Sequence, residues 1–339
     1  MSSSSPIRFA IVGAGRIGQR HLGIIERHPE GEVVALCDLL HKDALGLSGS
    51  ALPLYHDLAQ LLSEGPEFDV LCIASPNGLH ASQAIMALKH GRHVLIEKPM
   101  ALRRADCEQV IFEALHRSKQ VFCVMQNRYS PPAIWLKGLL QSGQLGTIYR
   151  VQISCYWNRD DRYYTPGGWH GTKDLDGGTL FTQFSHFIDM LYWLFGDITD
   201  ISSRFANVNH GHSTQFEDSG QVHFRLVNGG GMGSLDYSTA VWDKNLESSL
   251  TVIAEKGSIK ISGQYMNEVV YCHVEGYHMP ELPPSEPPYD YGPYQGSAAN
   301  HHYIFQNVMD VLHGRDAIAI NALEGLKVVD IIERMYGGA

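Results

Sequence analysis

The sequence predicts an α/β protein with two domains: a parallel sheet wound with helices, then an α+β domain with a large, mostly antiparallel sheet. Three observations lead to this prediction. The chain has 339 residues, which suits two domains of roughly 100–200 residues each. Its first third alternates strand-like and helix-like segments. In the remainder, strands follow one another without helices between them.

The first domain is expected over residues 1–125. Segments between its strands, such as 81–89 and 105–117, place apolar residues three and four positions apart, which is the spacing of a helix. Buried strands separated by helices indicate βαβ units and therefore a parallel sheet. The expected strands are the apolar runs 7–12, 32–38, 69–74, 93–96 and 121–125.

The second domain is expected over residues 126–339. Residues 147–157 alternate apolar and polar side chains, which is the period of a half-buried strand. More alternating runs follow in succession, and this order indicates an antiparallel sheet. Such a sheet, with one polar and one apolar face, can pair with copies of itself. The further expected strands are 221–227, 233–237, 249–254, 258–262 and 269–274.

Helices and one loop complete the second domain. Prolines at 131 and 132 fit the first turn of a helix that ends near residue 142. One long helix is expected over 177–195, with Asp176 as its N-cap. Residues 275–296 are rich in Pro and Tyr and predict a long irregular loop, usually a functional or a disordered feature. The closing helices are expected at about 300–313 and 323–336, and the last can pack back on the first domain.

Composition excludes several classes of protein. The apolar fraction of 44% and the charged fraction of 18% fit a globular core and not a disordered chain. A net charge of -10 argues against a nucleic-acid binder. Six cysteines without a CxxC pair indicate free thiols of a reducing compartment. The serine-rich start has no apolar signal region, and the longest apolar run, 188–195, is far below the ~20 residues of a membrane span. We therefore expect a cytoplasmic protein without a membrane partner.

A glycine-rich run after the first strand predicts a dinucleotide site. The run Gly-Ala-Gly-Arg-Ile-Gly at 13–18 follows an apolar strand and opens a helix, and Asp38 ends the next strand 20 residues after Gly18. This is the Rossmann fingerprint. Its glycines allow a tight turn, a close approach to a pyrophosphate and packing of the helix, whose free N–H groups face the phosphates. The cofactor-binding residues expected in this run are Gly13, Gly15, Arg16, Ile17 and Gly18.

The cofactor expected here is NAD. Asp38 can accept hydrogen bonds from both ribose hydroxyls and would repel a 2′-phosphate, and no arginine stands beside it. The loop after the third strand adds Ser75, Asn77 and His80 as candidate cofactor-facing residues, although each of the three could instead cap a helix.

The strand at 93–96, which ends in Glu97-Lys98-Pro99, resembles the glucose–fructose oxidoreductase/inositol dehydrogenase/rhizopine catabolism (Gfo/Idh/MocA) family. The resemblance extends over nearly the whole chain and includes the fingerprint, the Ser-Pro-Asn…His loop, and a Gly-Gly pair at 177–178 followed by His186 and Asp189. It implies that Glu97, Lys98 and Gln126 contact NAD, that the peptide before Pro99 is cis, and that the protein is a homodimer or homotetramer.

Within that family, several stretches resemble bacterial NAD-dependent 3-dehydrogenases of UDP-N-acetylglucosamine or its uronic acid. Many family members carry an aspartate four residues before the histidine, where this chain has Thr182, and the subgroup likewise has an uncharged residue there. What orients His186 is therefore open, with Asp189 as one candidate. The similar stretches are 126–128, 157–159, 163–172, 176–178 and 253–258.

The proposed catalytic residues are Lys98 and His186. Oxidation of a secondary alcohol needs a fixed nicotinamide, a base for the hydroxyl proton and stabilisation of the alkoxide. Lys98 follows a strand end, where its ammonium group can hydrogen-bond the reacting hydroxyl, although it could be a plain surface lysine. A histidine can take the proton at neutral pH, although His186 could instead be a core histidine satisfied by Asp189.

A sugar nucleotide also needs flat surfaces for its base and sugar, and cations or amides for its diphosphate. Each candidate for these contacts could equally serve the fold. No HExxH motif, paired Cys or carboxylate partner accompanies the 18 histidines, so no metal site is expected. The expected substrate-binding residues are Arg128, Tyr129, Trp157, Asn158, Arg159, Trp169, His170, Thr182, Gln183, His186 and Asn245.

Together these features predict an NAD-dependent dehydrogenase that oxidises the 3-hydroxyl of a UDP-N-acetylhexosamine or its uronic acid. As in the resembling enzymes, the 3-keto sugar would serve an aminotransferase in the synthesis of amino sugars for cell-surface polysaccharide or lipid A. Two alternatives remain: a dehydrogenase of a free polyol or sugar of the inositol type, and a non-catalytic sensor of NAD(H) or sugar. One domain would hold the dinucleotide and the other the sugar.

Overall fold

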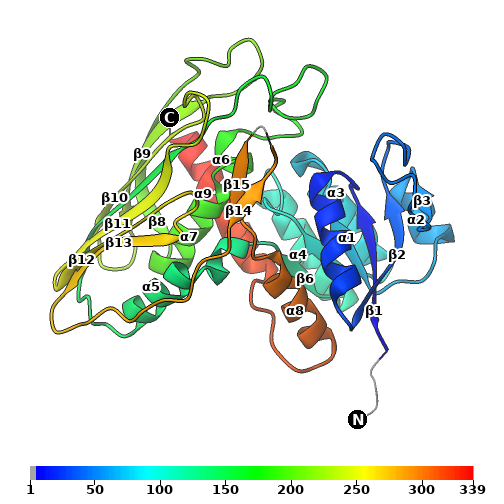
Figure 1. The fold of residues 1–339 in the computed structure, drawn as a ribbon, viewed down its shortest axis with the longest axis horizontal. Coiled ribbons are helices and arrows are strands. Elements are labelled where there is room, and N and C mark those ends of the chain that lie inside the picture. The colour runs from blue at the N-terminus through cyan, green and yellow to red at the C-terminus, as the bar shows by residue number, and fades with distance from the viewer. Residues whose placement is uncertain (1–4, 293, 339) are drawn as a thin grey trace. The chain divides into compact units, whose positions relative to one another are not determined.

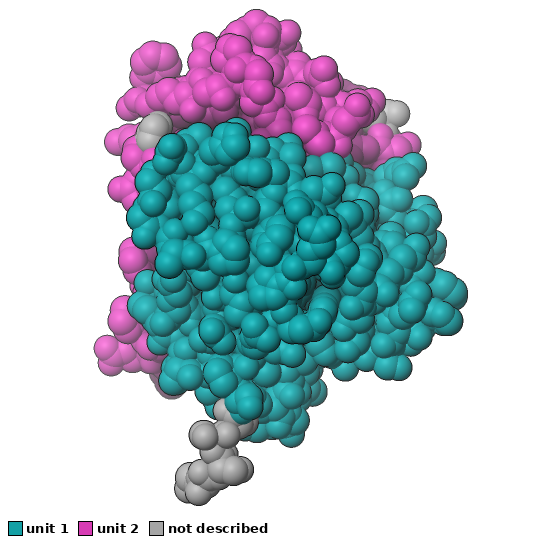
Figure 2. All heavy atoms as spheres, turned by 90° about the vertical axis from the view of Figure 1, so that its right-hand side faces the viewer, with its two compact units in different colours: residues 1–124, 301–329 teal, residues 125–300, 330–339 magenta. Residues whose placement is uncertain are grey.

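The computed structural model describes residues 5–292 and 294–338, so the serine-rich start at 1–4 lies outside the described residues. The chain folds into two compact units, which Figure 2 colours separately. Unit 1 comprises residues 1–124 and 301–329, and unit 2 comprises residues 125–300 and 330–339. Within the described ranges, no helix is both long and apolar enough to cross a membrane.

Unit 1 contains a six-stranded parallel sheet in the order β3-β2-β1-β4-β5-β6. This is the doubly wound order of a Rossmann fold, and it confirms the predicted parallel sheet (Figure 1). The strands are β1 (Ile7–Val12), β2 (Gly31–Cys37), β3 (Leu54–Tyr55), β4 (Val70–Ile73), β5 (His93–Ile96) and β6 (Val121–Cys123).

The helices of unit 1 pack in pairs, α1 with α8 and α3 with α4. The sheet between them is buried on both faces, which explains why β4 is apolar at all four positions. The helices are α1 (Arg16–Arg27), α2 (Leu58–Glu64), α3 (His80–Lys89), α4 (Arg104–Arg117) and α8 (His301–Leu312), with a 3-10 turn η1 (Asn77–Leu79). The last helix, α9 (Ala322–Gly337), is divided between the two units.

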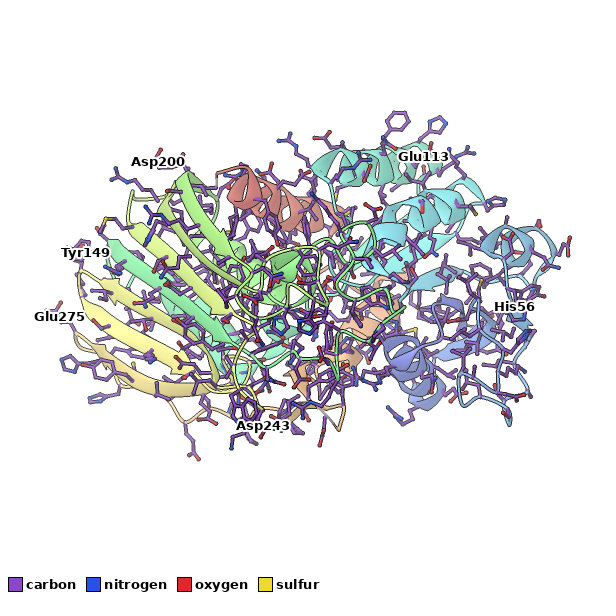
Figure 3. The ribbon with its side chains drawn as sticks, turned by 90° about the horizontal axis from the view of Figure 1, so that it is seen from above. His56, Glu113, Tyr149, Asp200, Asp243 and Glu275 are labelled. Atoms are coloured by element: carbon purple, nitrogen blue, oxygen red, sulfur yellow. The ribbon has the colours of Figure 1, made fainter. Side chains whose placement is uncertain are left out.

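Unit 2 contains a seven-stranded sheet in the order β13-β12-β11-β7-β10-β9-β8. Neighbouring strands are antiparallel except β7 and β10, which pair in parallel. In Figure 3 the sheet extends from Asp200 on β8 to Glu275, which follows β13, with Tyr149 on the central β7. The strands are β7 (Ile148–Tyr156), β8 (Ile198–Ala206), β9 (Ser219–Leu226), β10 (Met232–Ser238), β11 (Glu247–Ala254), β12 (Gly257–Ser262) and β13 (Glu268–Val274).

The predicted loop at 275–296 is only partly irregular, because it contains β14 (Pro288–Asp290), which pairs with β15 (Gln295–Ala298). The other elements of unit 2 are a 3-10 turn η2 (Gln126–Tyr129) and the helices α5 (Pro131–Gln141), α6 (Thr179–Thr182) and α7 (Ser185–Phe195).

The single long helix predicted over 177–195 is wrong, since α6 and α7 are separate. Gly177 and Gly178 have positive φ values of 89° and 131°, which delay the start of the helix. After α6, the backbone N–H of Phe184 donates to the carbonyl oxygen of Thr179, five residues earlier. This bond makes the turn between α6 and α7 wider than an α-helical turn. The ring of Phe184 packs edge-on against Trp157 at 5.6 Å, so tertiary contact fixes the break.

Two glycines on α1 give the first prediction. A Cβ on Gly18 would lie 1.9 Å from the carbonyl oxygen of Gly13, which is fixed backbone, whereas a Cβ on Gly23 meets only the end of the Arg27 side chain at 3.3 Å. We expect Gly18→Ala to lower the free energy of unfolding by about 2 kcal/mol or more. Gly23→Ala should raise it by up to about 1 kcal/mol through helix propensity. Urea unfolding measures both, and equal stabilities of the two variants would contradict the prediction.

Candidate active site

The glycine run after β1 is shaped by close backbone contacts. Gly13 has φ +86°, and a Cβ there would lie 2.5 Å from the carbonyl carbon and oxygen of Ala74, the residue after β4. Gly15 is the N-cap of α1 and makes no side-chain capping bond. A Cβ on Gly15 would meet nothing within 4 Å. The loop is therefore closely packed at Gly13, whereas open space lies beside Gly15 at the N-terminus of α1.

Asp38 follows β2 and holds the glycine run. Its Oδ2 accepts the backbone N–H of Ala14 at 2.7 Å, and its Oδ1 accepts that of Leu40 at 2.9 Å. Each carboxylate oxygen retains a second lone pair. The carboxylate is only partly buried, so it can still accept from the hydroxyls of a ribose.

The start of α1 fits the pyrophosphate of NAD. The first turn of α1 carries no acidic side chain, so its N-terminal N–H groups and helix dipole favour a pyrophosphate. Arg16 and Ile17 lie in that turn, Arg16 exposed and Ile17 half-buried. The open space at Gly15 lets a phosphate approach the backbone.

Among the other predicted cofactor residues, His80 is enclosed by backbone. Its Nδ1 lies 2.7 Å from the carbonyl oxygen of Pro99, and its Nε2 lies 2.9 Å from that of Ser75. Burial lowers the pKa of His80, although the two carbonyls and Glu97 act in the opposite direction. The hydroxyl of Ser75 donates to Gln83 at 2.6 Å, and Asn77 is buried in η1.

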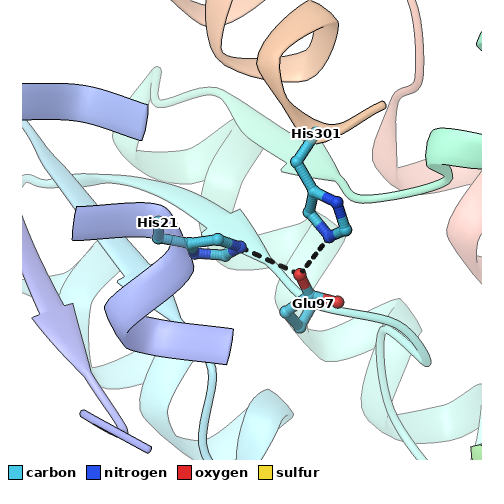
Figure 4. Close-up of side chains that lie close together, drawn as sticks. All are labelled: His21, Glu97 and His301. Atoms are coloured by element: carbon cyan, nitrogen blue, oxygen red, sulfur yellow. Dashed lines mark hydrogen bonds and ion pairs between the residues drawn. The ribbon is translucent and has the colours of Figure 1, made fainter. Parts of the chain in front are cut away.

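Lys98 is the second residue after β5 and is half-buried, and the peptide between Lys98 and Pro99 is cis. The preceding Glu97 is buried. Its Oε1 lies 2.9 Å from Nε2 of His21 and 3.2 Å from Nε2 of His301, as Figure 4 shows. Its Oε2 accepts the backbone N–H of Lys98 at 3.2 Å. The carboxylate of Glu97, predicted to contact NAD, is thus engaged inside unit 1, and that contact stays a prediction.

His186 belongs to unit 2 and is buried in the first turn of α7. Its Nε2 lies 3.4 Å from the amide nitrogen of Gln126, a predicted cofactor residue. The hydroxyl of Thr182 donates to the carboxylate of Asp176, which also accepts the backbone N–H of Gly171 at 2.7 Å. Asp176 is therefore a buried anchor of this loop and not the N-cap predicted from the sequence.

Asp189, the candidate for orienting His186, forms a buried ion pair with Arg128. The guanidinium donates from Nη2 to Oδ1 at 2.5 Å and from Nε to Oδ2 at 2.9 Å. Arg128 also lies over the ring of Trp193, with 5.6 Å to the centroid. Its charge is thus matched by a carboxylate, and the predicted contact of Arg128 with a sugar nucleotide stays a prediction.

Four other predicted substrate residues surround the buried guanidinium of Arg159. Arg159 donates to Oε1 of Gln183 at 2.8 Å and to Oδ1 of Asn245 at 3.3 Å, and it lies 4.8 Å from the ring centroid of Trp157. It also donates to the carbonyl oxygen of Asn158 at 2.5 Å. Burial lowers the pKa of Arg159, yet a guanidinium stays charged near neutral pH.

Three neighbours of this guanidinium were not among the predicted site residues. Tyr163 accepts a hydrogen bond from Gln183 at 2.7 Å, and its ring lies 4.1 Å from that of His170, which in turn lies 3.8 Å from Trp169. The other two come from the Pro/Tyr segment at 275–296. The ring centroid of Tyr294 lies 4.9 Å from Cζ of Arg159, and the backbone carbonyl oxygen of Gln295 accepts a hydrogen bond from Nη2 of Arg159 at 3.1 Å. The enrichment of that segment in Tyr was the one available signal. Tyr129, also predicted, lies in η2 and is half-buried.

Two family models match the chain in order. An oxidoreductase family with an NAD-binding Rossmann fold matches residues 7–125, and the GFO/IDH/MocA C-terminal domain matches residues 134–260.

The chain is also similar to solved structures of WlbA dehydrogenases, each in complex with NADH and UDP-GlcNAcA. The protein from Chromobacterium violaceum is 30% identical, with 99% of this chain and 94% of that chain covered and a TM-score of 0.88. The protein from Bordetella pertussis is 30% identical, with 98% and 96% covered and a TM-score of 0.88. An inositol 2-dehydrogenase from Salmonella typhimurium is 28% identical over 197 residues, which cover 56% of this chain and 55% of that protein.

The models of the N-terminal and C-terminal domains of one family thus match this chain in order. The 30% identity to the WlbA dehydrogenase of Chromobacterium violaceum extends over nearly the whole chain. The protein belongs to the Gfo/Idh/MocA family of oxidoreductases, and its first unit is an NAD-binding Rossmann domain.

Proposed function

We propose that this protein is an NAD-dependent dehydrogenase that oxidises the 3-hydroxyl of a UDP-N-acetylhexosamine, or of its uronic acid, to a 3-keto sugar. The observation that carries the proposal is the full-length similarity to the two WlbA dehydrogenases, whose structures contain UDP-GlcNAcA. A shared fold alone does not determine the substrate. Support for a UDP-sugar therefore has to come from the side chains of unit 2.

The environment of Arg159 supports an anionic substrate. The residue is 2% exposed. In the part of the chain that the structure describes, its hydrogen-bond acceptors are all neutral oxygens, from Asn158, Gln183, Asn245 and Gln295. A buried cation is usually paired with an anion. A diphosphate or a uronate carboxylate would supply the missing charge, and a free polyol would not.

The residues of the chain have separate tasks in the proposed reaction. When bound, NAD supplies the acceptor for the hydride that leaves the sugar carbon. The ammonium group of Lys98 hydrogen-bonds the reacting hydroxyl and stabilises its anion. The imidazole of His186 takes the hydroxyl proton. The amide of Gln126, 3.4 Å from Nε2 of His186, helps to fix the ring.

An inositol-type activity is the second candidate, and the similarity to an inositol 2-dehydrogenase favours it. That similarity covers 56% of this chain, against 99% for the WlbA dehydrogenase of Chromobacterium violaceum. The neutral shell around Arg159 also argues for the charged substrate.

Two further parts of the proposal concern the whole protein. We place it in the cytoplasm because all six cysteines are free, five of them buried, as expected in a reducing compartment. We also propose a homodimer or homotetramer. The seven-stranded sheet supports this because its strand β9 alternates buried with exposed residues, which leaves one face of the sheet available for pairing.

The second prediction tests the substrate. The protein is incubated with NAD⁺ and either UDP-N-acetylglucosamine or its uronate, and NADH is followed by absorbance, with a 2-keto acid added to reoxidise NADH that stays bound. We expect turnover with a UDP-sugar and none with a panel of free polyols that includes inositol. Turnover on the polyols alone would replace the proposal by the inositol-type activity, and no turnover or binding of either UDP-sugar would reject it.

The third prediction concerns Lys98. Lys98→Met should leave the Kd of NAD unchanged and slow hydride transfer by about 10²–10³-fold, which is the usual cost of removing one hydrogen-bond donor to a developing oxyanion. Lys89→Met is the matched control, because Lys89 ends α3 with 52% of its side chain exposed. Stopped-flow measurement of NADH formation gives the rate, and a Lys98→Met rate equal to that of the control would remove Lys98 from the reaction.

The fourth prediction uses the open space at Gly15. An added Cβ meets no atom of the protein within 4 Å, so Gly15→Ala should keep the wild-type Tm. It should weaken NAD binding by roughly tenfold or more, about 1.4 kcal/mol, because the methyl group takes the place of the pyrophosphate. Gly49→Ala, where a Cβ also meets nothing within 4 Å, is the control. Unchanged NAD affinity in calorimetric titration would place the pyrophosphate elsewhere.

A further inference from the structure

We infer that Glu97 is a positioning residue for Lys98, and that His21 and His301 act by holding its carboxylate in place. The inference rests on the proposed function of Lys98 in hydride transfer. It assigns a task to two buried histidines, from α1 and α8, to which the proposed reaction gives no role.

The three side chains converge from distant parts of the sequence (Figure 4). His21 lies on α1, Glu97 directly follows β5, and His301 is the first residue of α8. Their exposed fractions are 0%, 6% and 2%. All three belong to unit 1, so a single carboxylate oxygen connects a strand end to two helices of the same unit.

The protons of this cluster can be assigned from its acceptors. Oε1 of Glu97 lies 2.9 Å from Nε2 of His21 and 3.2 Å from Nε2 of His301. Because a carboxylate oxygen only accepts hydrogen bonds, each Nε2 must carry a hydrogen and donate it. Burial alone would raise the pKa of Glu97, but the hydrogen bonds and charges of the two histidines outweigh it and hold the pKa well below its ordinary value. The carboxylate is therefore ionised and keeps full acceptor strength.

A metal ion would need the opposite arrangement. The same three side chains bring ligand atoms within 4.8 Å of one another, which is close enough for a metal ion. Both imidazoles would then present bare Nε2 atoms and carry their hydrogens on Nδ1. Nδ1 of His21 is buried, and no described residue accepts a hydrogen bond from it. Metal-bound histidines normally donate that second N–H to a partner, so the geometry favours hydrogen bonds to Glu97.

The second oxygen of Glu97 transmits this arrangement to Lys98. Oε2 accepts the backbone N–H of Lys98 at 3.2 Å. On the C-terminal side of Lys98, Nδ1 of His80 lies 2.7 Å from the carbonyl oxygen of Pro99. The backbone of Lys98 is thus held from both sides. Because a lysine side chain is long and flexible, a fixed backbone determines which volume its ammonium group can reach.

The test replaces His301 in two ways. His301→Leu removes the donor to Oε1, whereas His301→Gln supplies an amide N–H in its place. His302→Leu is the matched control, because His302 is the next residue of α8 and is exposed. Glu97→Gln serves as a second disruptive variant: it keeps the size of the side chain, but an amide offers one acceptor oxygen where the carboxylate offers two.

Two readouts are taken on each full-length variant. Hydrogen exchange of the peptide containing residues 97–100 reports the Lys98 amide together with those of Glu97 and Met100, since only Pro99 has no N–H. Steady-state kinetics with NAD⁺ and the UDP-sugar separate kcat from KM. We expect His301→Leu and Glu97→Gln to exchange this peptide about tenfold faster or more and to lower kcat about 10–100-fold with little change in KM, as a displacement near 1 Å does. His301→Gln should recover most of both.

Several results would overturn the inference. One is wild-type exchange and kcat in both disruptive variants; another is an equal loss in His301→Leu, His301→Gln and the His302→Leu control. One equivalent of metal in the purified protein that disappears in His301→Leu would replace hydrogen bonding by coordination. The exchange readout needs no substrate, so it decides how Lys98 is held even if no UDP-sugar is turned over. Failure of the proposed function shows separately, as the absence of turnover and of binding of either UDP-sugar by the wild-type protein.

Discussion

Unit 1 depends on the close approach of two backbone segments where β1 and β4 end. The turn after β1 passes so near the carbonyl group of Ala74 that a Cβ on Gly13 would lie 2.5 Å from it. The next contact, between Gly18 and the carbonyl oxygen of Gly13, is closer still. These contacts set where α1 begins and aim its N-terminal N–H groups past Gly15. Residues that follow the strands of a parallel sheet share one edge, which is where such folds bind their ligands.

The buried charged side chains of the candidate active site have two contrasting kinds of environment. Arg128 is neutralised within the protein by the carboxylate of Asp189, and the carboxylate of Glu97 is held by the N–H groups of two histidines. Arg159 differs, because its described acceptors are neutral oxygens and its flanking groups are aromatic rings. Buried charges that are matched inside the protein serve to hold position, whereas a buried charge without a counter-ion is suited to an external anion.

The sequence predicted the elements whose signal is periodic and local. The strand at 93–96 and the helix beginning at Pro131 correspond closely to β5 and α5, because buried runs and prolines carry their own signal. The two-residue β3 is too short to show a period, and β8 was missed because its register shifts between Thr199 and Ser202, which interrupts the alternation.

The site was harder to predict because its contacts join residues far apart in sequence. His21 and His301 lie 76 and 204 residues from Glu97, and no local pattern pairs them. The environment of Arg159 likewise combines β-strand ends with the Pro/Tyr segment, so Tyr294 emerged only from the fold. The glycine fingerprint and the Glu-Lys-Pro run were recognisable because each is a short motif with its own chemistry.

Isotope transfer tests most directly that hydride moves from carbon 3 of a UDP-sugar to NAD. The protein is incubated with NAD⁺ and UDP-N-acetylglucosaminuronate that carries deuterium only at carbon 3, and the NADH is analysed by mass spectrometry. We predict NADH heavier by one mass unit, together with a slower hydride-transfer step than with the unlabelled sugar. Unlabelled NADH, with the deuterium still on the sugar, would contradict oxidation at carbon 3.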